Sequence, residues 1–104
     1  MITRIIFCTI ALLLVVGGLW AYHHDQKLEH SAEMVDLGDP NETVRELMGE
    51  PSREGECGSM TLAPGNCADE YVYRYYFSFF PPQYQVVWFD REGKVLGEQR
   101  VRQP

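Results

Sequence analysis

The most apolar part of the chain is its beginning. From Ile5 to Tyr22 the sequence reads IIFCTIALLLVVGGLWAY and contains no charged residue. A helix of that length measures about 27 Å, enough to cross the hydrocarbon core of a bilayer. Trp20 and Tyr22 close the run, and such side chains favour the membrane interface. The pattern predicts a membrane-spanning helix over residues 1–22.

Three kinds of segment have this pattern: a cleaved secretory signal, a lipoprotein signal and an uncleaved signal anchor. A lipoprotein signal needs a cysteine just after the apolar run, but Cys8 lies inside it. Cleavage after Gly18 or Ala21 stays open because both residues are small, although no Ala-x-Ala pattern is present. The run is longer than most signal-peptide cores, which favours the uncleaved anchor.

The flanks of the run predict its orientation. Arg4 and the α-amino group precede it, whereas HHDQKLEH follows, with Lys27 diluted by acids. The positive-inside rule then leaves the N-terminus in the cytoplasm. We expect a single-pass protein of the bacterial inner membrane with its C-terminal domain in the periplasm, or a periplasmic protein if the leader is cleaved.

A short helix is predicted within DPNETVRELMGEP, residues 39–51. Asp39 suits the N-cap, Pro40 the first helical position, and Glu42 a capping box. Gly49 suits the C-terminal left-handed position, and Pro51 prevents continuation. The apolar stripe of this helix, at i, i+3 and i+4, consists of Val44, Leu47 and Met48. Two turns are unstable alone, so the stripe must dock on another element.

From Glu70 onward the pattern changes to strands. EYVYRYYFSFF alternates in a way that predicts one strongly aromatic face. That face comprises Tyr71, Tyr73, Tyr75, Phe77 and Phe79. Arg74 and Ser78 mark the other face as more polar, and the prolines at 81 and 82 end the strand because neither can donate to a ladder.

Residues 84–101, YQVVWFDREGKVLGEQRV, predict a hairpin. Its turn is Asp90–Gly93, with the glycine in the left-handed region. The expected register pairs Asp90 with Lys94, Phe89 with Val95 and Val87 with Gly97. The opposite face would then place Tyr84, Val86 and Trp88 against Arg100, Glu98 and Leu96. The predicted fold class is α+β: an N-terminal anchor, then a short helical layer on a three-stranded antiparallel meander. Its boundaries are 1–22 for the anchor, 23–36 for a polar linker that can be helical, and 37–104 for the domain.

Charge excludes one class of partner. The chain has nine Lys and Arg residues against fifteen Asp and Glu, and a net charge of −6. An acidic domain without a basic cluster is a poor nucleic-acid binder.

Two cysteines bracket GSMTLAPGN, a loop rich in glycine and proline. In an oxidising compartment, Cys57 and Cys67 are predicted to form a disulfide that closes this loop. A redox pair would favour Cys-x-x-Cys spacing, and a zinc site would need two further ligands.

The candidate chemistry is sparse. His23 and His24 are adjacent and cannot point the same way on a helix, and His30 is too far along to complete a face with His23. No serine has a histidine in a context that suits a triad, and no glycine pattern suits a phosphate loop. We therefore expect a protein that is not an enzyme, with no cofactor, no metal and no small-molecule substrate.

The strands contain more aromatic residues than one face of a small core can cover. The second face offers a candidate interaction surface, formed by Tyr76, Phe80, Tyr84 and Trp88. Alternatively, these side chains cover one another across the strands or lie under the cysteine loop. The sequence leaves both interpretations open.

The order of these parts resembles the SmpA/OmlA (BamE-like) family. The matching motifs are Gly38, Met48-Gly49-Glu50-Pro51, Tyr71–Tyr75 and Gly93-Lys94-Val95, within roughly residues 30–101. The resemblance implies an α+β domain in the bacterial envelope; the best-known member is an accessory lipoprotein of the machinery that inserts outer-membrane β-barrels. This chain departs from the family because it lacks the lipid-bearing cysteine and inserts the Cys57–Cys67 loop.

The family also has a first helix ahead of the one at 39–51. Residues 29–35 can extend such a helix here, since Leu28, Ala32 and Val35 lie at i, i+4 and i+7. We expect a membrane-anchored protein-interaction module whose partner is another envelope protein, accessory to outer-membrane protein assembly or envelope integrity. The alternative is a regulatory, inhibitor-like or structural subunit of an inner-membrane complex.

Overall fold

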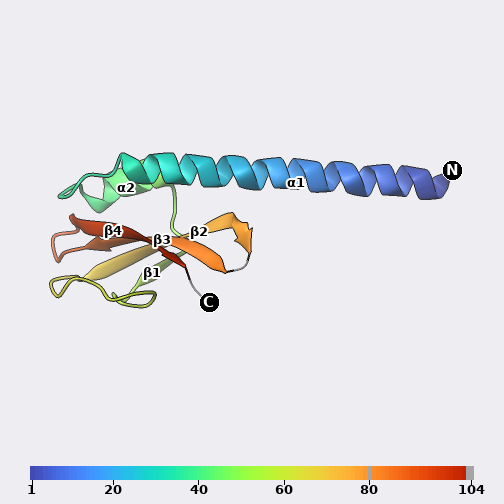
Figure 1. Cartoon of the computed structure of the whole chain (residues 1–104). Helices are drawn as coiled ribbons and strands as arrows, with labels where there is room; N and C mark the ends of the chain where they lie inside the picture. The colour runs from blue at the N-terminus through green and yellow to red at the C-terminus, as the bar shows by residue number, and fades with distance from the viewer. Residues whose placement is uncertain (80, 103–104) are drawn as a thin grey trace.

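The computed structural model describes residues 1–79 and 81–102, without the side chains of residues 78 and 79. The elements are α1 (Ile2–Glu33), α2 (Asn41–Met48), β1 (Arg53–Gly55), β2 (Asp69–Phe79), β3 (Pro82–Phe89) and β4 (Val95–Arg102). The strands form one antiparallel sheet in the order β1-β2-β3-β4. The C-terminal half of α1 lies along one face of the sheet, and its N-terminal half projects beyond it (Figure 1).

The predicted α+β class is confirmed, but the sheet has four strands instead of three. The additional strand, β1, pairs Arg53 with Val72 and Gly55 with Glu70 at the edge of β2. It has only three residues, all exposed. Such a segment has no apolar alternation, so the sequence pattern contained no signal for it.

The apolar run and the first domain helix are one continuous helix. α1 passes residue 22 without a break and ends at Glu33. Its last turns belong to the domain core, because Leu28 and Ala32 are buried, as the extended first helix predicts. Val35 is also buried, but it lies beyond the end of the helix, which stops two residues short of the predicted position. The large apolar side chains of its first 20 residues are exposed.

The core lies between the helices and one face of the sheet. Its buried members are Leu28, Val35, Val44, Tyr71, Tyr73, Tyr75, Val87, Phe89 and Val95, with Leu47 and Met48 partly buried against them. The prediction for Tyr71, Tyr73 and Tyr75 is confirmed. The prediction that Phe77 is buried in this core is wrong: it is 53% exposed and contacts Tyr22 of α1 from the irregular stretch of β2 between Arg74 and Phe79. The faces predicted for Ser78 and Phe79 lie outside the described side chains.

The short helix α2 does not begin as predicted. Pro40 is its N-cap, with no side-chain cap bond, and the Asp39 carboxylate accepts from the Asp36 amide instead. The physical reason is tertiary: Val95 N donates to Asp39 O at 2.9 Å, and Asn41 N donates to Gly93 O at 2.8 Å. These bonds hold residues 39 and 40 extended, so the helix starts later. The predicted end is confirmed, with Gly49 at φ +85°.

α2 also plays a smaller part than the sequence suggested. The helix that covers the sheet is mainly α1, which packs on β2, while α2 packs on α1. α2 closes one side of the core through Val44 and two polar contacts. Arg45 Nε donates to Tyr71 Oη at 3.1 Å, and Tyr73 Oη donates to the Gly49 carbonyl at 2.8 Å.

The β3–β4 turn is confirmed and the register beyond it is not. Asp90 N donates to Lys94 O, Phe89 pairs with Val95, and Gly93 has φ +76°. An irregularity between Trp88 and Phe89 then shifts the pairing with β4 by one residue. Val87 therefore pairs with Glu98 rather than Gly97, and Tyr84, Val86 and Trp88 face Val101, Gln99 and Gly97.

Candidate interaction surface

Two hydrogen bonds to one aspartate side chain join the polar half of α1 to the end of β2. Asp25 accepts hydrogen bonds from the consecutive backbone amides of Tyr76 and Phe77, both at 2.7 Å. Its side chain is mostly buried. These amides lie within the irregular part of β2, where β3 does not pair regularly. The carboxylate therefore satisfies strand amides that the sheet leaves without a partner.

Aromatic side chains surround this junction. Tyr76 stacks on Trp20 and on His24, with ring centroids 5.5 Å and 4.2 Å apart, and Phe77 meets Tyr22 edge to face at 6.0 Å. Tyr76 is still 36% exposed. The aromatic end of the predicted membrane span thus contacts the domain directly, which fixes the domain beside the helix.

The surface predicted from sequence is only partly exposed. Tyr76 lies at the junction just described, Tyr84 is half-buried, and Phe80 lies outside the described residues. Trp88 is 6% exposed, so its assignment to an open surface is wrong. The physical reason is the cysteine loop, which lies on the side of the sheet away from α1 (Figure 1). The alternative interpretation, in which such side chains lie under that loop, holds for Trp88.

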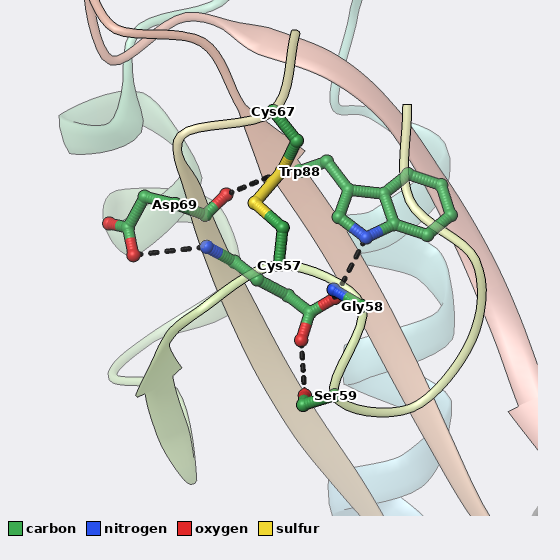
Figure 2. The surroundings of a disulfide bond; sticks show 7 residues. Cys57, Gly58, Ser59, Cys67, Asp69 and Trp88 are labelled. Carbon is green, nitrogen blue, oxygen red and sulfur yellow. Dashed lines mark hydrogen bonds between the residues drawn. A yellow bond between two sulfur atoms is a disulfide. The ribbon is translucent and has the colours of Figure 1, made fainter. Parts of the chain in front are cut away.

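The loop is held by a disulfide and by a buried carboxylate. Cys57 and Cys67 are bonded with their Cα atoms 6.2 Å apart, and Figure 2 shows the bridge beside the Trp88 indole. Glu70, which is 1% exposed, accepts from the Trp88 indole nitrogen at 2.8 Å and from the Gly58 amide at 3.1 Å. The Ser59 hydroxyl donates to its other oxygen. Glu70 therefore ties the loop to β2 and β3.

Sequence reasoning missed both of these carboxylates. Asp25 was part of a polar linker, and Glu70 was the first residue of an aromatic strand. The available signal was an acid close to an aromatic segment, but the partners of both acids lie far away along the chain. For Asp25 the separation to Tyr76 is 51 residues.

Burial raises the pKa of several ionisable groups on the helix-facing side of the sheet, and Tyr73, whose hydroxyl donates to the Gly49 carbonyl, is one of them. Burial raises the pKa of Tyr75 to about 12, although the nearby Arg100, which lies over the ring, opposes the shift. Burial also raises the pKa of Glu98, against a hydrogen bond from Gln85. The Glu98 Oε2 atom is buried and has no hydrogen-bond partner among the described residues.

The three histidines do not converge. His24 stacks on Tyr76, whereas His23 and His30 are exposed on α1. Within residues 1–79 and 81–102, no three His, Cys, Asp or Glu side chains gather in a way that would hold a metal ion. The described side chains at this surface form packing contacts and hydrogen bonds that join α1, the sheet and the cysteine loop.

Exposed apolar side chains lie at both ends of the domain. Besides Phe77 at the anchor end, Met34 and Leu37 are exposed in the connection between α1 and α2, Leu37 at 75%. This connection lies at the end of the domain farthest from the N-terminus (Figure 1).

α1 is long and apolar enough to cross a membrane, with a mean hydropathy of 2.3 over its most apolar window and none of that window buried. Comparison with models of protein families, with curated proteins and with solved structures finds no match to the chain. The resemblance to the SmpA/OmlA (BamE-like) family therefore rests on the motifs quoted above.

Proposed function

We propose that this protein is a non-catalytic, single-pass membrane protein that presents a small α+β domain for contact with another envelope protein. One observation carries the proposal: α1 is a continuous helix whose apolar half is bare and whose polar half packs on the domain through Leu28, Ser31 and Ala32. A helix shared in this way suits an anchor that positions its domain, because the domain cannot swing on a flexible linker.

The orientation belongs to the same proposal. Arg4 precedes the span and favours a cytoplasmic N-terminus. The Cys57–Cys67 disulfide supports a domain in an oxidising compartment, which in a bacterial envelope is the periplasm. Both observations favour the same topology.

The partner surface we propose is the end of the domain away from the anchor. Met34 and Leu37 are exposed there beside acidic residues that include Asp36. An apolar patch with an acidic rim suits a protein partner that offers an apolar pocket bordered by cations. By its resemblance to the SmpA/OmlA family, the protein would act as an accessory factor in outer-membrane protein assembly or envelope integrity.

In-cell photo-crosslinking tests this function. A photoreactive amino acid in place of Leu37 should yield one discrete crosslinked protein, identified by mass spectrometry as a component of outer-membrane assembly. The matched control carries the same group in place of Arg53 on β1, which is exposed on another side. Equal labelling from both positions, or none from Leu37, would remove the proposed surface.

A second candidate, a subunit of an inner-membrane complex, is favoured by a different observation. Gly17 and Gly18 lie on the bare half of α1, and the space where their Cβ atoms would lie is open to 4 Å. Small residues let a second membrane helix approach closely. Crosslinks from Gly17 to a membrane protein, without any from Leu37, would favour this candidate.

A further inference from the structure

The end of the sheet nearest the anchor combines exposed aromatic side chains with cations. Tyr76 and Phe77 contact Trp20 and Tyr22 on α1. They nonetheless keep 36% and 53% of their surface exposed. Large exposed aromatic side chains on a small domain indicate a contact surface. The position of Tyr76 and Phe77 beside the anchor indicates what that surface contacts.

Their depth relative to the membrane follows from α1. Trp20 and Tyr22 mark the end of the apolar run, so they lie at the boundary between hydrocarbon and headgroups. Tyr76 and Phe77 touch these two side chains and must lie at nearly the same level. Figure 1 shows the end of β2 beside α1, near the level at which the helix extends past the sheet.

Charge at this end differs from that of the domain as a whole. Arg74 pairs with Tyr84, and Arg102 pairs with Gln83, so both arginines lie opposite the first residues of β3, toward this end of the sheet. Both are exposed, and within the described part of the chain neither forms an ion pair. Unpaired arginines beside interfacial aromatics match an anionic lipid surface.

We propose that Arg74, Tyr76, Phe77 and Arg102 form a membrane-facing end that rests on the anionic phospholipid surface around the anchor. The inference rests on the proposed membrane anchor and deepens it. The aromatic rings enter the headgroup layer, the two guanidinium groups bind lipid phosphates, and the Asp25 bonds hold β2 in place. The domain is thereby fixed against the bilayer, with Leu37 directed away from it.

Lipid crosslinking with the full-length protein tests this directly. The protein is reconstituted in vesicles of phosphatidylcholine and phosphatidylglycerol, with benzoylphenylalanine in place of Phe77. The matched control carries it in place of Leu37, which is also exposed and apolar but lies at the other end. Irradiation should attach phospholipid at position 77 and not at position 37, as seen in the intact mass.

A second experiment removes charge and tests whether the two arginines bind anionic lipid. Arg74→Gln combined with Arg102→Gln should lower the lipid adduct at position 77 at least about threefold. The control combines Arg91→Gln and Lys94→Gln, the same loss of charge near the β3–β4 turn, and should leave the adduct unchanged. Equal yields from the two double variants would overturn the electrostatic contact.

The failures are distinguishable. Protein that floats with the vesicles but gives no lipid adduct at position 77, or gives a crosslinked pair of chains there, overturns this inference and leaves the anchor intact. Protein that does not float with the vesicles overturns both.

Discussion

The Asp25 carboxylate bridges two consecutive amides of β2, and Tyr76 is the first of them, 51 residues farther along the chain. One side chain of α1 thus connects this helix to the end of the sheet. Charge-assisted bonds of this kind are stronger than neutral ones, and loss of the acceptor leaves amides unpaired.

Asp25→Ala should therefore lower the free energy of unfolding by about 2–3 kcal/mol, because hydrogen bonds to charged groups contribute about that much. Hydrogen exchange at Tyr76 and Phe77 should accelerate more than elsewhere in the sheet. Glu33→Ala, an exposed acid near the end of α1, is the control. Unchanged protection of both amides in the Asp25 variant would contradict the bridge.

Trp88→Ala should unfold the domain more readily, by about 3–5 kcal/mol, since it opens a cavity and leaves the Glu70 carboxylate without its indole donor. Leu62→Ala, in the same loop region but 92% exposed, should change stability little. Urea unfolding in detergent micelles measures both. Nearly equal midpoints for the two variants would mean that Trp88 is not core.

Replacement of Cys57 and Cys67 together by serine should cost about 2–3 kcal/mol, as expected for a short closed loop. The domain should still fold, because the helices and three of the strands form the core without the loop. Non-reducing mass spectrometry of protein from native membranes should find this linkage. Two free thiols in that sample would argue against the proposed oxidising compartment.

Glu98 should make stability depend on pH. Burial raises its folded pKa above 4.5, so the folded state binds a proton that the unfolded state has lost. The stabilisation is fully present below pH 4.5 and is lost as pH rises through the folded pKa. Glu98→Gln should flatten this dependence and raise stability near pH 7 by up to about 1 kcal/mol. The control is Glu46→Gln, exposed on α2, and a pH profile unaltered by Glu98→Gln would refute the assignment.

The features that depend on a few adjacent residues were predictable from the sequence. The apolar run, the stop at Gly49 and the turn at Gly93 are each specified by a few adjacent residues, and the structure has all three. The sequence also allowed the helix that carries Leu28 and Ala32, although Val35 lies beyond its end.

Features set by tertiary contacts were not predictable in this way. Asp39 looked like a cap, but residues 39–41 pair with the β3–β4 hairpin and delay the helix. The irregularity between Trp88 and Phe89 shifts the β4 partner of each β3 residue before Phe89 by one position. Whether Trp88 is exposed stayed open, because nothing in its own strand shows that a distant loop covers it.

Only part of the candidate surface is exposed, for the same reason. Alternation along β2 could not show that Asp25 would capture the amides of Tyr76 and Phe77 at an irregular stretch. That capture, and not strand periodicity, places Tyr76 against Trp20.

The most direct test of the account is the N-terminal sequence of the mature protein recovered from carbonate-washed membranes. If α1 is one helix that both spans the bilayer and completes the domain core, the mature chain should keep the apolar run and begin at Met1 or Ile2, in the membrane fraction. A soluble mature protein that begins at Leu19 or Tyr22, after cleavage at Gly18 or Ala21, would contradict the anchor and every proposal that depends on it.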